Sequence, residues 1–145
     1  MKTKRLTILV LVLSFFALAD AWYLADTALE GKVPTCEVAA FSNCAEVAQS
    51  AFARPLGIPL GVYGAMFAAV IFMLAAMALL VPERRLYRAM FVLSSAAAVG
   101  SVGLIGIQLF IIHATCIYCF IFELLSFALL GATFALRRRT RPHSA

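Results

Sequence analysis

Charged residues are scarce in this 145-residue chain, and their scarcity limits what the protein can be. Only 13% of the residues are charged, whereas 64% are apolar and the mean hydropathy is +0.99. Because a water-soluble surface needs roughly twice that charged fraction, the composition excludes an ordinary soluble domain. It also excludes a disordered chain and a nucleic-acid-binding arm. We therefore expect one lipid-embedded domain over residues 1–145.

Several chemical signatures are also missing from the sequence. It contains no internal repeat, no phosphate-binding glycine loop, no zinc-ligand spacing and no Ser-His-Asp arrangement. We therefore expect no metal site and no nucleic-acid partner. The chemistry must come from other residues.

Long uncharged stretches predict four membrane-spanning helices. A spanning helix needs about 20 mostly apolar residues, and residues 58–81 carry no charge. Residues 89–136 are long enough for two helices joined by a turn near His113, and residues 6–24 form a shorter run interrupted by Asp20. The expected fold is an all-α membrane protein, a four-transmembrane-helix bundle with a large extracytoplasmic loop between helices 1 and 2. The expected bounds are about 6–25, 58–81, 87–112 and 115–136 for the helices and 26–57 for the loop.

The first apolar run has a second interpretation as a cleaved signal peptide. Basic residues precede it, and the Ala-Leu-Ala triplet at 17–19 resembles a cleavage site. A retained helix is favoured because apolar residues resume after Asp20, and Trp22 and Tyr23 suit the aromatic belt at a membrane interface. We expect the helix to end near these aromatic residues, with Asp20 reaching the interface.

Basic residues predict the orientation of the chain. Ten of the twelve Lys and Arg residues precede the first span, lie between the second and third, or follow the fourth. The positive-inside rule assigns these segments to the cytoplasm. Both termini are then cytoplasmic, and loop 26–57 lies outside.

This orientation places all four cysteines on the outer side. Cys36 and Cys44 lie in the loop, and Cys116 and Cys119 open the fourth helix. Two structural disulfides would explain the loop pair well, since a disulfide crosslink stabilises a long loop in an oxidising compartment. They explain the second pair poorly, because Cys-x-x-Cys at a helix N-terminus is the arrangement that stabilises thiolates and exchanges disulfides.

The depth of the second pair limits its redox partner. A thiol pair at the lipid boundary can meet a lipid-soluble two-electron carrier, which means a quinone, and disulfide formation is itself a two-electron step. The loop pair lies in water and can meet a protein thiol. Two pairs in series would connect a soluble partner to a membrane quinone.

Two further motifs lie between the cysteine pairs in the sequence. The full order is Cys36-x7-Cys44, Gly57-Ile58-Pro59-Leu60, Tyr63-Gly64 and Cys116-Ile117-Tyr118-Cys119. This order resembles the vitamin K epoxide reductase family. Ser50 falls where that family carries a serine near its active site. DsbB has similar chemistry but carries its Cys-x-x-Cys in the first outer loop, so the order here argues against DsbB.

The resemblance implies a bundle around a quinone of the ubiquinone or menaquinone type, in a bacterial-type inner or plasma membrane, with the active site at the extracytoplasmic face. Cys119 would react with the quinone, Cys116 would exchange with the loop, and Cys36 with Cys44 would serve the partner. Bacterial members resemble disulfide-forming oxidases, and many carry a fused thioredoxin-like domain. No such domain follows here, so we expect a separate DsbA-like partner of thioredoxin fold.

Two positions depart from the vertebrate members of that family. Leu60 and Glu123 stand where those members place an Asn and a Tyr that hold the quinone oxygens, which speaks against vitamin K epoxide as the substrate. Glu123 shares a helix face with Cys116 and Cys119, and a carboxyl group inside a membrane is usually functional or paired. We expect Glu123 to donate a hydrogen bond to a quinone oxygen or to relay a proton. The structural alternative is a hydrogen bond to another helix.

Other polar residues are secondary candidates for the quinone or proton path. His113 titrates near neutrality or simply faces water. Gln108 bonds a quinone oxygen or a neighbouring helix. Residues 44–52 have the pattern of a short amphipathic helix that caps the quinone pocket or anchors the loop. The secondary candidates are Ser50, Gln108 and His113.

Gly100, Gly103 and Gly106 recur every three residues, a spacing that lets helices approach closely in lipid, and we expect them to serve packing alone. The competing functional hypothesis is a non-enzymatic membrane protein, a small transporter or an assembly subunit, held together by two structural disulfides.

Overall fold

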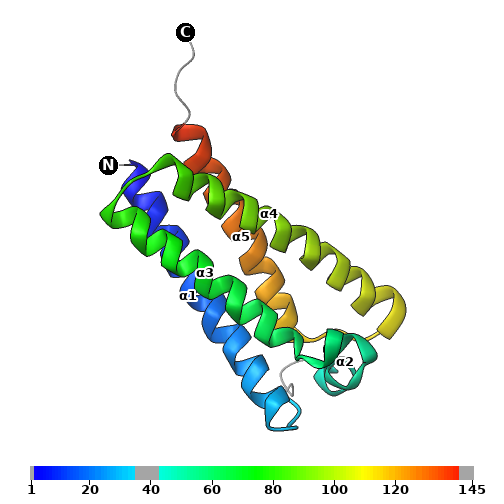
Figure 1. The fold of residues 1–145 in the computed structure, drawn as a ribbon. Helices are drawn as coiled ribbons and strands as arrows, with labels where there is room; N and C mark the ends of the chain where they lie inside the picture. The colour runs from blue at the N-terminus through cyan, green and yellow to red at the C-terminus, as the bar shows by residue number, and fades with distance from the viewer. Residues whose placement is uncertain (1, 35–42, 141–145) are drawn as a thin grey trace.

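Residues 2–34 and 43–140 are described by the computed structural model of the chain, which is almost entirely helical in these ranges (Figure 1). The four long helices have the length and apolar composition needed to cross a membrane. The prediction of an all-α chain with four such helices is confirmed. The long helices are α1 (Lys2–Leu29), α3 (Leu60–Leu80), α4 (Arg84–Ile107) and α5 (Ile117–Arg139). The short elements are α2 (Cys44–Gln49), the 3-10 turns η1 (Ala51–Ala53) and η2 (Pro55–Gly57), and the π-helical turn η3 (Gln108–Ile112).

The first helix is longer than the sequence predicts. The prediction ends it near residue 25, close to its aromatic residues, but α1 continues to Leu29. Gly31 terminates it in the left-handed conformation (φ +69°), where its N–H donates to the Ala28 carbonyl and the Lys32 N–H donates to the Thr27 carbonyl. The local capping geometry therefore sets this boundary, and the end of the apolar run does not.

α3 and α5 begin and end within three residues of their predicted bounds, whereas α4 ends at Ile107 and the chain continues to the predicted residue 112 as η3. α4 begins at Arg84, before the predicted residue 87, and α5 ends at Arg139, beyond the predicted residue 136. Basic side chains in the last turn of a helix interact favourably with its dipole, so the arginines at 137–139 extend α5 where composition alone indicates the end of a span.

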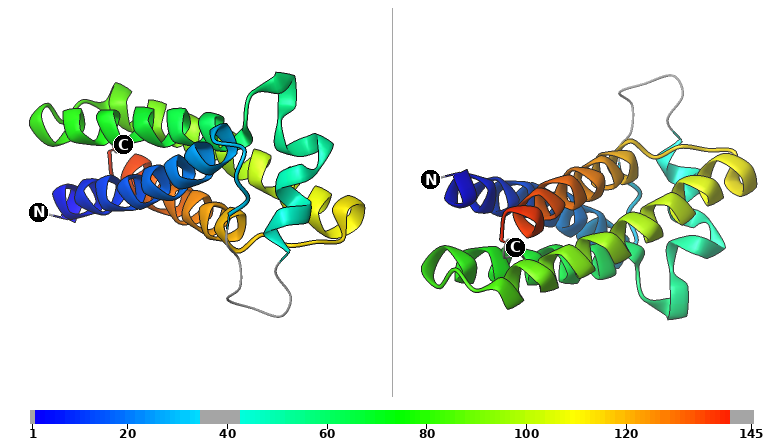
Figure 2. Two further views of the ribbon diagram at one scale, coloured as in Figure 1. Left: turned by 90° about the horizontal axis from the view of Figure 1, so that it is seen from below. Right: turned by 90° about the horizontal axis from the view of Figure 1, so that it is seen from above.

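The long helices form one bundle. α1 packs against α3 and α5, and α4 packs against α5 and α3. The beginnings of α1 and α4 and the end of α5 lie at one end of the bundle, and α2 lies at the other (Figures 1 and 2). This arrangement places the three basic clusters of the sequence at the same end.

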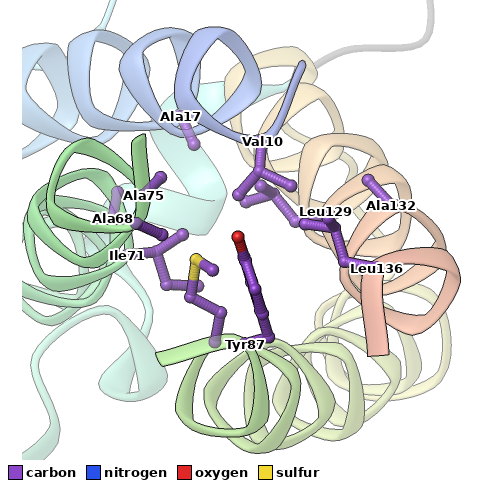
Figure 3. Packing of buried hydrophobic residues seen from close by; sticks show 11 residues of the cluster. Val10, Ala17, Ala68, Ile71, Ala75, Tyr87, Leu129, Ala132 and Leu136 are labelled. Atoms are coloured by element: carbon purple, nitrogen blue, oxygen red, sulfur yellow. The ribbon is translucent and has the colours of Figure 1, made fainter. Parts of the chain in front are cut away.

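Most side chains of the buried core are alanines or branched aliphatic residues, with Tyr87 and Met90 among them. Figure 3 shows residues of all four long helices around it, including Val10, Ile71, Tyr87 and Leu129. In lipid such packing relies on van der Waals contact and close backbone approach. At Gly61 the backbones of α1 and α3 come so close that an added Cβ would lie 2.6 Å from the Ala25 nitrogen.

The packing role expected for Gly100, Gly103 and Gly106 is wrong for the described chain. A Cβ at any of these positions would meet no atom within 4 Å beyond its own helix and chain neighbours. The buried face of α4 carries Ser94, Ala98 and Ser101 instead, and successive residues on a helix are about 100° apart. The glycines therefore lie off the packed face, and Gly100 borders the cavity described below.

Candidate active site

Cys116 and Cys119 lie where α5 begins. Cys116 caps the helix with an extended backbone (φ −113°, ψ 120°), and its Sγ accepts a hydrogen bond from the Cys119 N–H at 3.5 Å. The pair therefore crosses the helix boundary, whereas the prediction of a helix from 115 places both cysteines inside it. A sulfur at this position is aimed at the N–H groups of the first turn, which stabilise a thiolate.

The pKa of Cys116 is lowered from 9.0 to about 7. The largest cause is a hydrogen bond from the Cys119 side chain, and the backbone N–H groups of Cys119 and Tyr118 add to it, while burial acts in the opposite direction. A large fraction of this thiol is therefore thiolate near neutral pH. The thiolate is the species that attacks and departs in disulfide exchange.

Cys44 begins α2 and faces the second cysteine pair. Its Sγ lies 3.4 Å from the Sγ of Cys116, although the two residues are 72 positions apart in the sequence. Both side chains are buried, and Cys44 is disulfide-bonded. Cys36, the other predicted loop cysteine, lies outside the described residues. The contact between sulfurs is the geometry from which disulfide exchange starts.

Hydrogen bonds around Asn43 hold Cys44 beside Cys116. The Asn43 N–H donates to the carbonyl of Thr115 at 3.0 Å. The Asn43 side chain also caps α2, because its Oδ1 accepts from the Glu46 N–H at 3.3 Å and its Nδ2 donates to the Glu46 carboxylate at 3.0 Å. One residue therefore orients α2 and ties it to the segment before α5.

Gln108 joins the end of α4 to the start of α5. Its Oε1 accepts from the Cys116 N–H at 3.1 Å, and its Nε2 donates to Oε1 of Glu123 at 2.9 Å. Both Gln108 and Glu123 are buried. Gln108 begins η3, and π-helical turns of this kind occur often at functional sites. Gln108 and Glu123 thus make the hydrogen bond between helices that the sequence analysis gave as the structural alternative, and Gln108 also holds the Cys116 backbone.

A cavity of about 520 Å³ lies beside the cysteines. Its wall is mostly apolar and includes residues of all four long helices and α2, and its volume falls within the range of about 300–1,000 Å³ usual for small-molecule pockets. The reactive groups on this wall are Cys44, Cys116, Cys119 and Glu123. Such a wall fits an apolar ligand that needs few polar contacts. Within residues 2–34 and 43–140, no cluster of three or more His, Cys, Asp or Glu side chains has the arrangement of a metal site.

None of the three secondary candidates lines this cavity, although Gln108 donates a hydrogen bond to Glu123, which does. Ser50 ends α2, and its Oγ donates to the Val47 carbonyl at 2.8 Å. His113 is exposed and adopts a left-handed conformation (φ 57°) after η3. The amphipathic helix predicted over 44–52 ends at Gln49, and its Val47 and Ala48 border the cavity. α2 therefore covers part of the site.

Asp20 is a neighbour of the site that the sequence analysis assigned elsewhere. α1 continues past it to Leu29, so Asp20 does not reach the interface as a terminal group. Its charge acts on Cys116 and Cys119, and among the described residues its buried Oδ2 has no hydrogen-bond partner. The signal in the sequence was a lone acidic residue inside an apolar run, a feature that usually marks function in membrane helices.

The rings of Tyr23 and Tyr118 were not anticipated at the site. Their centroids lie 4.9 Å apart, and they connect α1 to the Cys-x-x-Cys turn. Tyr118 lies between the two cysteines of the motif, so this ring contact helps to fix the position of the turn. The sequence gave no indication of which helix Tyr118 would meet.

The profile of the vitamin K epoxide reductase family matches residues 8–134. No individual curated protein matches the sequence. The matched range covers most of the chain. It contains both cysteine pairs as well as Gln108 and Glu123. The resemblance drawn from the motifs is confirmed, and the chain belongs to the vitamin K epoxide reductase family.

Proposed function

We propose that the protein is a quinone-linked thiol-disulfide oxidoreductase that relays electrons from an extracytoplasmic thioredoxin-fold partner to a membrane quinone and so supports disulfide bond formation. The family is linked to quinones and to disulfide chemistry in general, which supports the reaction class. One observation carries the relay. The Sγ atoms of Cys44 and Cys116 lie 3.4 Å apart, on the wall of a cavity that Cys119 also lines.

The relay starts at the loop pair. The dithiol of the partner reduces the disulfide of Cys36 and Cys44, and the partner becomes a disulfide. The Cys44 thiolate attacks Cys116 in the disulfide of Cys116 and Cys119, and Cys119 departs with the electron pair of the broken bond. Cys36 then attacks Cys44, which restores the loop disulfide and releases Cys116. A pKa of about 7 makes Cys116 a good leaving group, because thiols of lower pKa depart faster.

The second pair then reduces the quinone, which is the electron-accepting substrate. Cys116 and Cys119 lose two electrons and two protons as their disulfide forms, and one quinone takes up both to become a hydroquinone. Cys119 borders the cavity and is the thiol assigned to this step.

Glu123 and Gln108 have supporting roles in the proposed reaction. Glu123 is buried on the cavity wall, and we assign it the transfer of a proton to a quinone oxygen. Gln108 acts as a positioning residue, since one amide holds both Glu123 and the Cys116 backbone. Ser50 and His113 have no role in the proposal. Neither lines the cavity, and among the described residues the Ser50 hydroxyl bonds only the Val47 carbonyl while His113 is exposed.

The experiment mixes the purified full chain with a reduced DsbA-like protein and a soluble ubiquinone or menaquinone analogue, and follows quinone absorbance. We expect one quinone to be consumed for each partner disulfide formed. Changing any of the four cysteines to Ala abolishes this coupled reaction, and the exposed control His113→Asn retains it. If the chain is instead a non-enzymatic membrane protein held together by two structural disulfides, no variant consumes quinone. Unchanged coupled turnover in Cys44→Ala would refute the relay.

A further inference from the structure

A second cavity, of about 260 Å³, lies at the end of the bundle opposite the cysteines. It is lined by Arg84, Arg88, Arg137 and Thr140. Arg84 and Arg88 are one turn apart at the start of α4, Arg137 is in the last turn of α5, and Thr140 caps α5. These side chains meet because α4 begins where α5 ends (Figures 1 and 2). Three guanidinium groups from two helices therefore share one space.

The charge of this cavity is not balanced by the described protein. No carboxylate lines the cavity. Across residues 2–34 and 43–140 the ion pairs are Lys32 with Glu30 and Arg85 with Glu83, so the three cavity arginines have no acidic partner. Like charges held together repel, and an anion from outside the chain relieves that repulsion.

Arg137 is held in place by an aromatic contact. Its guanidinium carbon lies 4.5 Å from the centroid of the Phe91 ring, a cation–π geometry that orders the side chain without neutralising it. The pocket is therefore partly organised before any ligand arrives, and its charge stays available for binding.

We propose that this pocket binds the phosphate group of an anionic phospholipid. The planar guanidinium group of arginine can donate two parallel hydrogen bonds to the oxygens of one phosphate group. The Thr140 hydroxyl adds a small polar group to the wall of the pocket. The pocket lies at the ends of two helices long enough to span a membrane, which is the depth of the headgroups. Basic pockets between membrane helices are known to take anionic headgroups.

A diffuse positive surface would produce a different response to substitution. Arg85, Arg138 and Arg139 belong to the same basic clusters but do not line the cavity. Under the positive-inside rule, the orientation of the chain in the membrane depends on how many basic residues flank the spans. Binding in a pocket depends instead on which particular basic residues line that pocket. The chain therefore supplies a control with the same loss of charge.

The test compares two triple variants of the full-length protein. The pocket variant is Arg84→Gln with Arg88→Gln and Arg137→Gln, and the control is Arg85→Gln with Arg138→Gln and Arg139→Gln. Native mass spectrometry of the detergent-solubilised proteins measures binding of phosphatidylglycerol, of phosphatidylcholine with the same acyl chains, and of inorganic phosphate. We expect wild type and control to prefer phosphatidylglycerol to phosphatidylcholine by at least about tenfold, and the pocket variant to lose that preference.

Each other outcome overturns part or all of the proposal. An equal loss of preference in both triple variants means diffuse surface charge. If inorganic phosphate binds as tightly as phosphatidylglycerol, the lipid assignment is wrong and the ligand of the pocket is a soluble anion. If circular dichroism shows that the pocket variant does not fold, Arg88→Gln and Arg85→Gln are compared instead. The first should lower phosphatidylglycerol affinity about fivefold more than the second, and equal affinities refute the pocket.

Discussion

The side chain and backbone of Cys116 touch three separate parts of the site. Its sulfur lies 3.4 Å from that of Cys44, its N–H donates to Gln108, and its Sγ accepts from the Cys119 N–H. Exchange with the loop and re-formation of the second pair both pass through this one sulfur in the proposed relay. Its ionisation is therefore the property at the residue scale that should control the rate of exchange.

We expect the alkylation rate of Cys116 in the reduced pair to rise with pH around a midpoint near 7, below the ordinary value of 9.0. The thiolate is the reactive form, so a lowered pKa shifts the rise to lower pH. Cys119→Ala removes the main hydrogen-bond donor and should move the midpoint upward. Asp20→Asn removes a negative charge that raises the pKa and should move it downward. Site-resolved mass spectrometry after iodoacetamide labelling measures the midpoints, and a shared midpoint near 9.0 contradicts the assignment.

Glu123 should control quinone turnover. Glu123→Leu removes both the hydrogen bond and the exchangeable proton, so we expect the rate of quinone reduction to fall by at least about a hundredfold, the usual size of a proton-transfer contribution. Glu123→Gln keeps a donor of similar size but cannot relay a proton. It should therefore lower kcat with little change in KM for the quinone. Steady-state kinetics with a saturating reduced partner measures both constants.

Ser126 supplies the control for the Glu123 variants. It is buried about one turn deeper in α5, and its Oγ donates to the Phe122 carbonyl within its own helix. Ser126→Ala should leave both kinetic constants close to those of the wild type. A Glu123→Leu variant that matches the wild-type rate and quinone affinity would make Glu123 structural, with its bond to Gln108 as its whole role.

At the scale of elements, the segment containing α2 matters because it brings a loop cysteine to α5. Its anchor is the Asn43 N–H bond to Thr115, and its apolar side borders the cavity. Six helical residues have little stability in isolation. The docked position of Cys44 therefore depends on this anchor and on burial against the long helices.

The docking of α2 predicts a specific trapped species. Cys119→Ala leaves Cys116 without its own partner, so Cys116 should form a stable mixed disulfide with Cys44. Peptide mapping under non-reducing conditions detects it. Cys116→Ala is the matched control, because it removes the sulfur in contact with Cys44 and should abolish that species. Recovery of Cys116 in Cys119→Ala only as a free thiol, under oxidising conditions, would count against the relay.

The contact between α1 and α3 predicts a loss of stability in Gly61→Ala. The added Cβ would lie 2.6 Å from the Ala25 nitrogen and 3.0 Å from the Ala21 carbonyl oxygen, so the helices must separate. Overpacking of this kind costs about 1–3 kcal/mol. The control Gly131→Ala places a Cβ in open space in α5 and should unfold at or above the wild-type temperature. Thermal unfolding in one detergent measures both, and an unchanged Tm for Gly61→Ala would contradict the close contact.

The limits of sequence prediction are visible in particular residues. Apolar length and cysteine spacing are local properties, so the four spans and the family resemblance could be predicted. A bond from Gln108 or Glu123 to another helix was one predicted alternative, but their pairing with each other could not be predicted, because it depends on how the ends of α4 and α5 meet in space. The glycines at 100, 103 and 106 misled for a related reason, since spacing does not say which face of a helix is packed. Asp20 was placed wrongly because a single acid in an apolar run marks a helix end and a buried site equally well.

At the scale of the whole molecule, basic residues gather at one end of the bundle and most acidic residues lie toward the other. The basic starts of α1 and α4 and the basic last turn of α5 share one end of the bundle (Figure 1). Among the described residues, Glu83 is the one carboxylate at that end, and the other acidic residues lie in the half that carries the cysteines. The positive-inside rule turns this asymmetry into an orientation, and the orientation decides whether the cysteines meet an oxidising compartment.

We expect both termini to lie in the cytoplasm and the cysteines at the outer face. Two exposed positions at opposite ends test this in intact bacterial cells, Leu56→Cys in η2 (94% exposed) and Arg85→Cys at the start of α4 (side chain 92% exposed). A membrane-impermeant maleimide should label Leu56→Cys directly, and should label Arg85→Cys only after the membrane is permeabilised, relative to the parent chain. The reverse pattern would refute the orientation. It would also remove the proposed relay, because the loop cysteines would then face a reducing compartment in which their disulfide does not persist.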